Sequence, residues 1–336
     1  MKICIIGNRA HSSQVVPQGL KTDPDLRLCG WCAADDPPEM MCANLASWGC
    51  TAPRFEDYRV MLDEAKPDIA VIDGAFDRHA EICMEALKRN IHVLCEKPLV
   101  LSRGSFEQLS EAWRNSRAHV AAMTTMRFEA PFHLAGKFVR GGAIGEIRMI
   151  RVQKSYHLGP RAAFYHNRKS YGGTIPWIGI HAFDLMCFFT GGRRFVSAYA
   201  TQDFRDNAGN GTMESSAQAL LTMEDHIQCM ASIDYLRPAS AETFQDDRIR
   251  VAGNAGILEV CGGKVHLLDG SGSRIIEPGK QKHFLLTEFV HLIRGEETDI
   301  AADAEALELT ETALTVQESA DTGKIRFMRS GNKWKR

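Results

Sequence analysis

The sequence predicts an α/β protein in which a doubly wound parallel sheet is followed by a second, α+β domain. Up to about residue 123, short continuous apolar runs alternate with helical patterns, which is typical of βαβ units. Beyond that point, β-like segments follow one another, and turn residues join several of them. Because 336 residues are too many for one ordinary core, we predict two domains, 1–123 and 124–336.

Five apolar runs in the first part predict the strands of the parallel sheet. Because they are continuous rather than alternating, they suit a sheet that is covered on both faces. The runs are Ile3–Ile6, Leu26–Ala33, Ile69–Ile72, Ile91–Leu94 and Val120–Met123. Between them, apolar residues recur at helical spacing over Arg78–Asn90, and Ser102 is placed to cap a further helix.

The second part predicts a largely antiparallel sheet that is interrupted by helices. Six segments suit strands: Ile147–Val152, Val196–Thr201, Ala217–Thr222, Ile227–Ile233, Arg248–Val251 and Ile257–Val260. Helices are expected over Phe132–Arg140 and near Ile180–Phe189. A last helix is expected between a cap at Asp303 and a stop at Gly323.

The composition excludes several classes of function. A formal net charge of −2 provides no basic field to hold nucleic acid or an anionic membrane. No apolar run approaches the roughly 18–20 residues that span a bilayer, and the short N-terminal run does not suit a signal peptide. The ten cysteines show no paired framework, which favours a reducing, cytoplasmic setting. The basic end, Lys333–Arg336, indicates only a solvated tail.

The first predicted strand ends at Gly7 and leads into a helix, which is where a Rossmann fold holds the diphosphate of a dinucleotide. Against the GxGxxG pattern, Arg9 stands at the second glycine and Ser12 at the third. Arg9 puts the usual close backbone approach in doubt, although its guanidinium can itself contact a phosphate. An ordinary β–α turn therefore stays open as an alternative.

Asp35 follows the second predicted strand. A carboxylate at this distance from the glycine turn can accept hydrogen bonds from both ribose hydroxyls of NAD, and it would repel the extra phosphate of NADP. The alternative role is that of a strand-end or helix-capping residue. Together, Gly7 and Asp35 predict a site for NAD, with NADP less favoured.

A longer pattern lies around the fourth predicted strand. His79-Ala80-Glu81 is followed by Ala86-Leu87, by His92-Val93 and by Glu96-Lys97-Pro98. This series closely resembles the signature H-A-E-x-x-x-x-A-L-x-x-G-x-H-V-x-x-E-K-P of the glucose–fructose oxidoreductase / inositol dehydrogenase / MocA (Gfo/Idh/MocA) family. Asn90 replaces the usual glycine, and Asn tolerates the same left-handed conformation.

Further similarity extends over nearly the whole chain, at Arg127-Phe128, at Gly142–Ile147, and at Gly172-Gly173 before Gly179–Leu185. The resemblance implies an N-terminal Rossmann domain and a C-terminal domain with a large, open, mainly antiparallel sheet. It implies an NAD-dependent dehydrogenase acting on a carbinol of a sugar, inositol or related polyol. It also implies a cis peptide bond before Pro98 and a homodimer or homotetramer that pairs through the open sheet.

One position departs from the family. Trp177 lies four residues before His181, where family dehydrogenases often carry Asp. An indole can instead stack on the apolar face of a sugar-like ring.

Hydride transfer from a carbinol leaves a hydroxyl proton that some group must accept. His181 is the first candidate because imidazole titrates near physiological pH. Asp184 follows three residues later and could orient that imidazole on a helix. Lys97 is the second candidate, as a cation that stabilises a developing alkoxide. A structural His and a surface Lys are the alternative roles.

The expected cofactor contacts are Gly7, Arg9, His11, Ser12, Asp35, His79, Glu96 and Lys97. The expected substrate contacts are Arg127, Tyr165, His166, Trp177 and His181. No metal site is expected, since the His, Cys, Asp and Glu spacings include no closely spaced ligand pairs.

Two other functions stay open. The first is a lyase or glycosidase that uses bound NAD for transient oxidation, which net NADH formation with a polyol would distinguish. The second is a non-catalytic sensor of a dinucleotide or metabolite, which the altered glycine turn and Trp177 favour. A test of whether bound NAD can be reduced would separate the sensor from an enzyme.

Overall fold

The structure is a computed structural model that describes residues 1–329, so the basic end predicted as a tail lies outside the described residues. The chain divides into two compact units. The first unit contains residues 1–123 and 284–307, and the second contains residues 124–283 and the described residues from 308 onward. The predicted division placed all of 124–336 in the second domain. It therefore differs from these units in the segment 284–307.

The first unit is built on a six-stranded sheet with the order β3-β2-β1-β4-β5-β6, and every neighbouring pair is parallel. Its strands are β1 (Lys2–Ile6), β2 (Arg27–Cys32), β3 (Arg54–Phe55), β4 (Ile69–Ile72), β5 (His92–Cys95) and β6 (Val120–Ala122). The central strand β4 is wholly buried, as a continuous apolar run predicts. The predicted parallel sheet is confirmed, and the sequence analysis missed only the two-residue β3.

Helices connect these strands: α1 (Ser12–Thr22), α2 (Pro38–Ser47), α3 (Tyr58–Ala65), the short η1 (Phe76–Arg78), α4 (His79–Lys88) and α5 (Arg103–Arg114). Ser102 caps α5 as predicted, since its hydroxyl accepts a hydrogen bond from the Ser105 amide at 3.2 Å. A further helix, α9 (Leu285–Arg294), packs against α1 in the same unit. The approach is close, because a Cβ on Gly19 would lie 2.4 Å from Leu286 Cδ2.

Gly7 sits where β1 passes into the turn before α1. Its φ is +76°, in the left-handed region that favours glycine. A Cβ at this position would lie 2.2 Å from the Cα of Gly74, which follows β4. The two backbones therefore meet at the carboxyl ends of neighbouring strands, and this contact positions the β1–α1 turn.

The second unit is built on a nine-stranded sheet with the order β14-β13-β12-β11-β7-β10-β9-β8-β15. Its strands are β7 (Ile147–His157), β8 (Phe195–Asp203), β9 (Ser216–Met223), β10 (Gln228–Arg237), β11 (Arg248–Gly253), β12 (Gly256–Cys261), β13 (Lys264–Asp269), β14 (Gly272–Ile276) and β15 (Arg326–Phe327). All neighbours are antiparallel except β7 and β10, which are parallel. The predicted mainly antiparallel sheet is confirmed.

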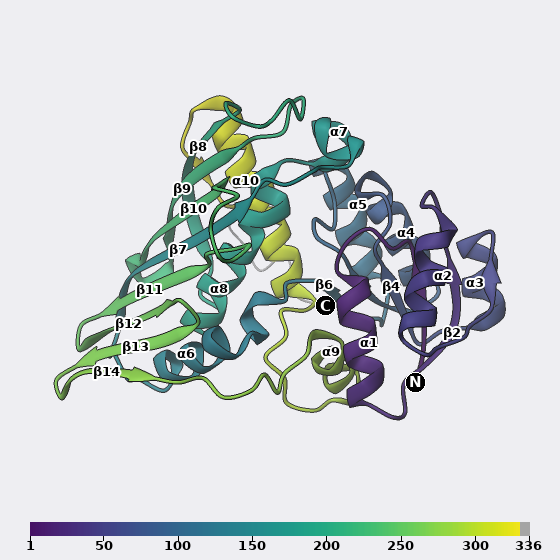
Figure 1. Ribbon diagram of the computed structural model, residues 1–336, viewed down its shortest axis with the longest axis horizontal. Helices are drawn as coiled ribbons and strands as arrows, with labels where there is room; N and C mark the ends of the chain where they lie inside the picture. Colours follow the sequence, from purple (N-terminus) through teal and green to yellow (C-terminus); the bar gives the residue numbers. More distant parts are fainter. Residues whose placement is uncertain (330–336) are drawn as a thin grey trace. The chain divides into compact units, whose positions relative to one another are not determined.

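Helices α6 (Ala130–Arg140) and α8 (Ile180–Thr190) pack on one face of this sheet, against β7, β10, β12 and β13 (Figure 1). The remaining elements are η2 (Met126–Phe128), η3 (Ala163–His166), α7 (Arg168–Tyr171), the π-helical turn η4 (Ile175–Gly179), η5 (Glu224–His226) and the long α10 (Ala304–Thr322). Among residues 1–329, no helix is both long enough and apolar enough to cross a membrane.

Candidate functional site

In the first unit, the candidate site forms at the carboxyl ends of β1, β4 and β5. A doubly wound parallel sheet exposes its ligand-binding crevice at these strand ends. Asp73 directly follows β4, Glu96 directly follows β5, and both carboxylates are completely buried. The β1–α1 turn lies over the carboxylate of Asp73, which accepts hydrogen bonds from the amides of Ala10 and Ser12.

Asp73 accepts backbone hydrogen bonds from the start of α1. The Ala10 amide lies 3.0 Å from each carboxylate oxygen of Asp73, and the Ser12 amide lies 2.9 Å from Oδ2. The Arg9 amide donates to the main-chain carbonyl of Asp73 at 2.8 Å. Burial, and secondarily the neighbouring Glu96 carboxylate, raise the pKa of Asp73 to about 7.

A second carboxylate, Asp36, holds the other half of the turn. It accepts a hydrogen bond from the Asn8 amide at 2.9 Å, and it forms an ion pair with the Arg9 guanidinium. Arg9 stands at a position from which the sequence predicted that its guanidinium can contact a phosphate of the cofactor. The structure shows that its guanidinium already carries a carboxylate partner.

Glu96 lies between the side chains of His11 and Lys97. Its Oε2 lies 2.9 Å from His11 Nδ1, and its Oε1 lies 3.2 Å from Lys97 Nζ. Burial raises the pKa of Glu96, but these two neighbours outweigh burial and leave the pKa below its ordinary value. A carboxylate that stays ionised favours the ammonium form of Lys97. Glu96 therefore suits Lys97 to the role of a cation rather than a base.

His79 and Asp35 occupy opposite environments. His79 is completely buried, and burial lowers its pKa. Its Nδ1 lies 2.9 Å from the Pro98 carbonyl oxygen, and its Nε2 lies 3.2 Å from the Gly74 carbonyl oxygen. It thereby joins the loop after β4 to the cis Lys97–Pro98 bond after β5, which the resemblance had implied. The Asp35 side chain is 54 % exposed and lies 3.4 Å from Arg78 Nη1.

These residues fit a dinucleotide at its ribose end. Asp35 is an accessible carboxylate three residues beyond the end of β2, in the region where a Rossmann fold binds ribose hydroxyls. At the diphosphate end, the amides of Asn8, Ala10 and Ser12 are already hydrogen-bonded to Asp36 and Asp73. A diphosphate bound at this turn would have to share or replace these internal acceptors.

In the second unit, the candidate residues lie around the start of α8. Trp177 lies in the π-helical turn η4, and His181 lies in the first turn of α8. Both side chains are largely buried, with 7 % of Trp177 and 3 % of His181 exposed. Single π-helical turns of this kind occur often at functional sites.

Arg127 and Asp184 form a buried ion pair. Arg127 Nε and Nη2 lie 3.0 Å and 2.5 Å from the two carboxylate oxygens of Asp184, and Arg127 also lies over the Phe188 ring. From the sequence, Arg127 is predicted to bind substrate and Asp184 to orient His181. The ion pair gives both residues a structural role that the sequence did not reveal, which is to join η2 to α8.

A further carboxylate, Glu214, anchors the segment that leads into η4. Glu214 is completely buried, forms an ion pair with Arg168, and accepts a hydrogen bond from the Thr174 amide at 3.0 Å. The Thr174 hydroxyl in turn donates to the Glu214 carbonyl at 2.8 Å. These contacts fix the start of the turn that carries Trp177.

Aromatic rings gather beside Trp177. The Trp177 ring lies 5.7 Å from Tyr165, and the Tyr171 and Tyr235 hydroxyls lie 3.1 Å apart. The Arg161 guanidinium lies 4.6 Å from the Tyr235 ring and 5.6 Å from the Tyr165 ring. The structure therefore brings Tyr165 close to Trp177. The main-chain carbonyl of the neighbouring His166 accepts a hydrogen bond from the Thr212 amide at 2.9 Å.

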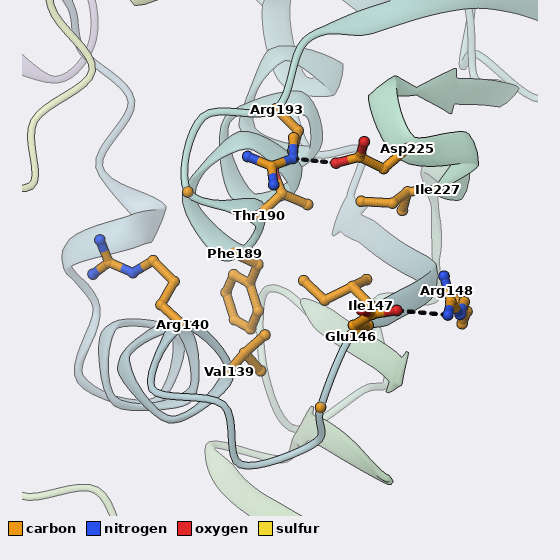
Figure 2. A pocket seen from close by; sticks show the side chains of 12 residues that line it. Val139, Arg140, Glu146, Ile147, Arg148, Phe189, Thr190, Arg193, Asp225 and Ile227 are labelled. Atoms are coloured by element: carbon orange, nitrogen blue, oxygen red, sulfur yellow. Dashed lines mark hydrogen bonds and ion pairs between the residues drawn. The ribbon is translucent and has the colours of Figure 1, made fainter. Parts of the chain in front are cut away.

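The second unit also contains a pocket of about 680 Å³ at the carboxyl ends of α6 and α8 (Figure 2). Val139, Phe189 and Ile147 line its apolar part. Two ion pairs contribute to its lining, Arg193–Asp225 at 2.6 Å and Arg148–Glu146 at 2.7 Å. None of the site residues expected from the sequence lines this pocket.

Sequence analysis missed several of these residues. Asp73 had a usable signal, since it directly follows a buried strand and precedes Gly74 at the edge where the crevice of a doubly wound sheet lies. Asp36 stands next to the residue chosen for the ribose. Glu214 had no local signal, because its partners Arg168 and Thr174 are separated from it by at least 40 positions.

Comparison with known proteins relates both units to one family. The family model described as an oxidoreductase family with an NAD-binding Rossmann fold matches residues 1–123. The model described as the GFO/IDH/MocA C-terminal domain matches residues 132–259.

Solved and curated relatives agree with these matches. A Thermotoga maritima protein assigned to the oxidoreductases is 36% identical, with a TM-score of 0.92 over 97% of this chain and 100% of its own. An inositol 2-dehydrogenase of Paenarthrobacter aurescens is 31% identical over 34% of this chain and 32% of its own length. A D-glucoside 3-dehydrogenase of Escherichia coli is 24% identical over 68% and 65%. The chain thus spans less than two thirds of the length of these two curated relatives.

The buried Arg127–Asp184 pair yields a prediction about stability. Arg127→Ala should lower the free energy of unfolding by about 3–5 kcal/mol, because it leaves a buried carboxylate without its cation. In the control, Arg148→Ala breaks an exposed pair with Glu146 and should cost about 1 kcal/mol or less. Urea unfolding measures both values, and equal losses would contradict the role given to the buried pair.

Proposed function

Because the chain belongs to the Gfo/Idh/MocA oxidoreductase family, whose first domain is an NAD-binding Rossmann fold, we propose that it is an NAD-dependent dehydrogenase. The reaction moves a hydride between nicotinamide and a carbinol carbon of a sugar, inositol or related polyol. The observation that carries the proposal is the ion pair between buried Glu96 and Lys97 at the end of β5. It supplies a lasting positive charge where an alkoxide must be stabilised.

We give the two candidate residues, His181 and Lys97, different roles in the reaction. In the oxidative direction, bound NAD would supply the hydride acceptor, and the hydroxyl proton of the carbinol would have to go to a base of the protein. We assign that proton to the imidazole of His181, since Glu96 favours a protonated Lys97. The Lys97 ammonium then stabilises the negative charge that develops on the oxygen. In the reductive direction, His181 returns the proton.

The substrate class rests on two supports. The relatives named inositol 2-dehydrogenase and D-glucoside 3-dehydrogenase both carry names of enzymes that act on polyhydroxylated rings. The rings of Trp177 and Tyr165 lie 5.7 Å apart beside the start of α8, and aromatic faces suit the apolar face of a sugar ring. We therefore assign substrate contact to Trp177, Tyr165 and His181. Arg127 has an indirect role, because its ion pair with Asp184 holds the helix that carries His181.

A reducing, cytoplasmic setting is part of the proposal. All ten cysteines are free thiols, several of them buried, which suits such a compartment. Cell fractionation tests this assignment, and recovery of the protein outside the cytoplasm would contradict it.

The catalytic roles predict a specific loss of turnover. Lys97→Ala and His181→Ala should each lower kcat by about 10²–10⁴, because each removes a charge-stabilising or proton-accepting group. Binding of NAD should persist in both variants. The assay is nicotinamide absorbance with a panel of polyols and sugar acids. Trp177→Ala should mainly raise KM, since an indole supplies contact area but transfers no proton.

Matched controls separate these effects from general damage. Lys88→Ala and His226→Ala remove an exposed lysine and an exposed histidine and should leave kcat unchanged. Full activity of His181→Ala on an identified substrate would remove His181 from the mechanism. Turnover without net NADH formation would instead indicate a lyase or glycosidase.

The accessible Asp35 predicts cofactor preference. Asp35→Ala should narrow the difference in Kd between NAD and NADP, because it removes the ribose acceptor and leaves Arg78 near the position of a 2′-phosphate. The double variant Asp35→Ala/Arg78→Ala should lose this gain in NADP affinity, since it also removes the guanidinium that lies beside Asp35. Calorimetric titration measures both affinities. Tighter binding of NADP than of NAD by the unaltered protein would show that Asp35 does not select the ribose.

The uncovered face of the large sheet predicts a homodimer or homotetramer. Leu220 is 57 % exposed, and its cross-strand neighbours there are Tyr199 and Met230. An apolar row on an exposed sheet face is typical of a protein interface. Leu220→Lys should dissociate the assembly, whereas Val60→Lys, at a site 46 % exposed in the first unit, should not. Light scattering at micromolar concentration measures the mass, and a monomeric unaltered protein would contradict the proposal.

A further inference from the structure

The start of α1 is already occupied by a carboxylate of the protein itself. The amides of Ala10 and Ser12 both donate to Asp73, which is completely buried. In a Rossmann fold, the first amides of this helix and the helix dipole bind the diphosphate of the cofactor. Asp73 therefore uses the same donors that the diphosphate needs.

Charge adds to this competition. The diphosphate of NAD is anionic, and an ionised Asp73 at the same helix end carries charge of the same sign. The Arg9 guanidinium, which could compensate, forms an ion pair with Asp36. Like charges repel strongly where burial limits screening by water. Asp73 thus opposes the cofactor when it is ionised and does so much less when it is neutral.

We propose that Asp73 determines the affinity for NAD by holding the amides of Ala10 and Ser12, and that the cofactor binds to the form in which Asp73 is protonated. This inference rests on the proposed function, because it assumes that NAD binds at the β1–α1 turn. It adds a residue that controls cofactor affinity from beneath the turn.

The surroundings of Asp73 bring its pKa close to neutral pH. Among the titratable groups, Glu96 at the end of β5 raises the pKa of Asp73, Asp73 in turn raises the pKa of the buried Cys95 thiol, and His11 lies beyond Glu96. Burial and the Glu96 charge raise the pKa of Asp73 to about 7, against the amide hydrogen bonds, which lower it. If NAD prefers the neutral form, binding raises this pKa further and takes up a proton. Affinity then falls as pH rises through about 7.

The experiment is calorimetric titration of NAD into the full-length protein at about pH 6 and about pH 8.5, in buffers of different ionisation heat. The unaltered protein should bind at least about tenfold more weakly at the higher pH, since a shift of one pKa unit corresponds to tenfold. It should take up a proton near neutral pH. Asp73→Asn keeps the shape and an amide acceptor but has no charge. It should bind tightly at both pH values without proton uptake.

Two matched variants and one alternative complete the design. Asp23→Asn makes the same chemical change just beyond the opposite end of α1, and it should leave the pH dependence of NAD affinity intact. His11→Gln removes the other titratable group of the turn. If Asp73→Asn does not fold, Asp73→Ala serves in its place, with thermal melting as the check.

The outcomes separate this inference from the proposed function. NAD binding that is independent of pH and takes up no proton would overturn the role of Asp73. A pH dependence that survives in Asp73→Asn but disappears in His11→Gln would assign the effect to His11 and also overturn it. NAD binding by Asp73→Asn but not by the unaltered protein would support the inference. Absence of NAD binding in every variant would overturn both.

Discussion

Buried carboxylates need hydrogen-bond donors or cations inside the protein, and this requirement shapes both candidate sites. Asp73 and Glu96 in the first unit, and Asp184 and Glu214 in the second, have no exposed surface. An unpaired charge in such a position costs several kcal/mol. Each carboxylate therefore draws backbone amides, arginine, lysine or histidine toward it, and in doing so fixes the segment on which those groups lie.

The segments held in this way carry the residues assigned to the chemistry. Glu96 holds Lys97 at the end of β5, and Glu214 holds Thr174 at the start of the turn that contains Trp177. Asp184 sits on the same helix as His181 and ties that helix to Arg127. The side chains that we assign to the chemistry are therefore positioned by ionic contacts of their own segments, in addition to the packing of helices on sheets.

The pKa values of two equally buried carboxylates, Glu96 and Asp73, are shifted in opposite directions. Glu96 faces His11 and Lys97, so its pKa lies below the ordinary value although burial opposes this. Burial, and then the charge of Glu96, raise the pKa of Asp73 to about 7, although the amides that donate to it lower this pKa. His11 and Lys97 thus favour the ionised form of Glu96. Asp73 accepts from backbone amides instead, and neutral amides stabilise an ionised carboxylate less than a cation does.

The sequence by itself determined the class of fold and the chemistry of the most local motifs. Continuous apolar runs such as Ile69–Ile72 predict buried parallel strands, because period and burial are properties of the chain alone. The Glu96-Lys97-Pro98 series indicated the family from adjacent residues. Tertiary structure decided which amides Asp73 accepts, which cation Asp184 holds, and that α9 packs against α1 in the first unit. These contacts join residues up to hundreds of positions apart, and no local pattern encodes a partner that only the folded sheet order brings within reach.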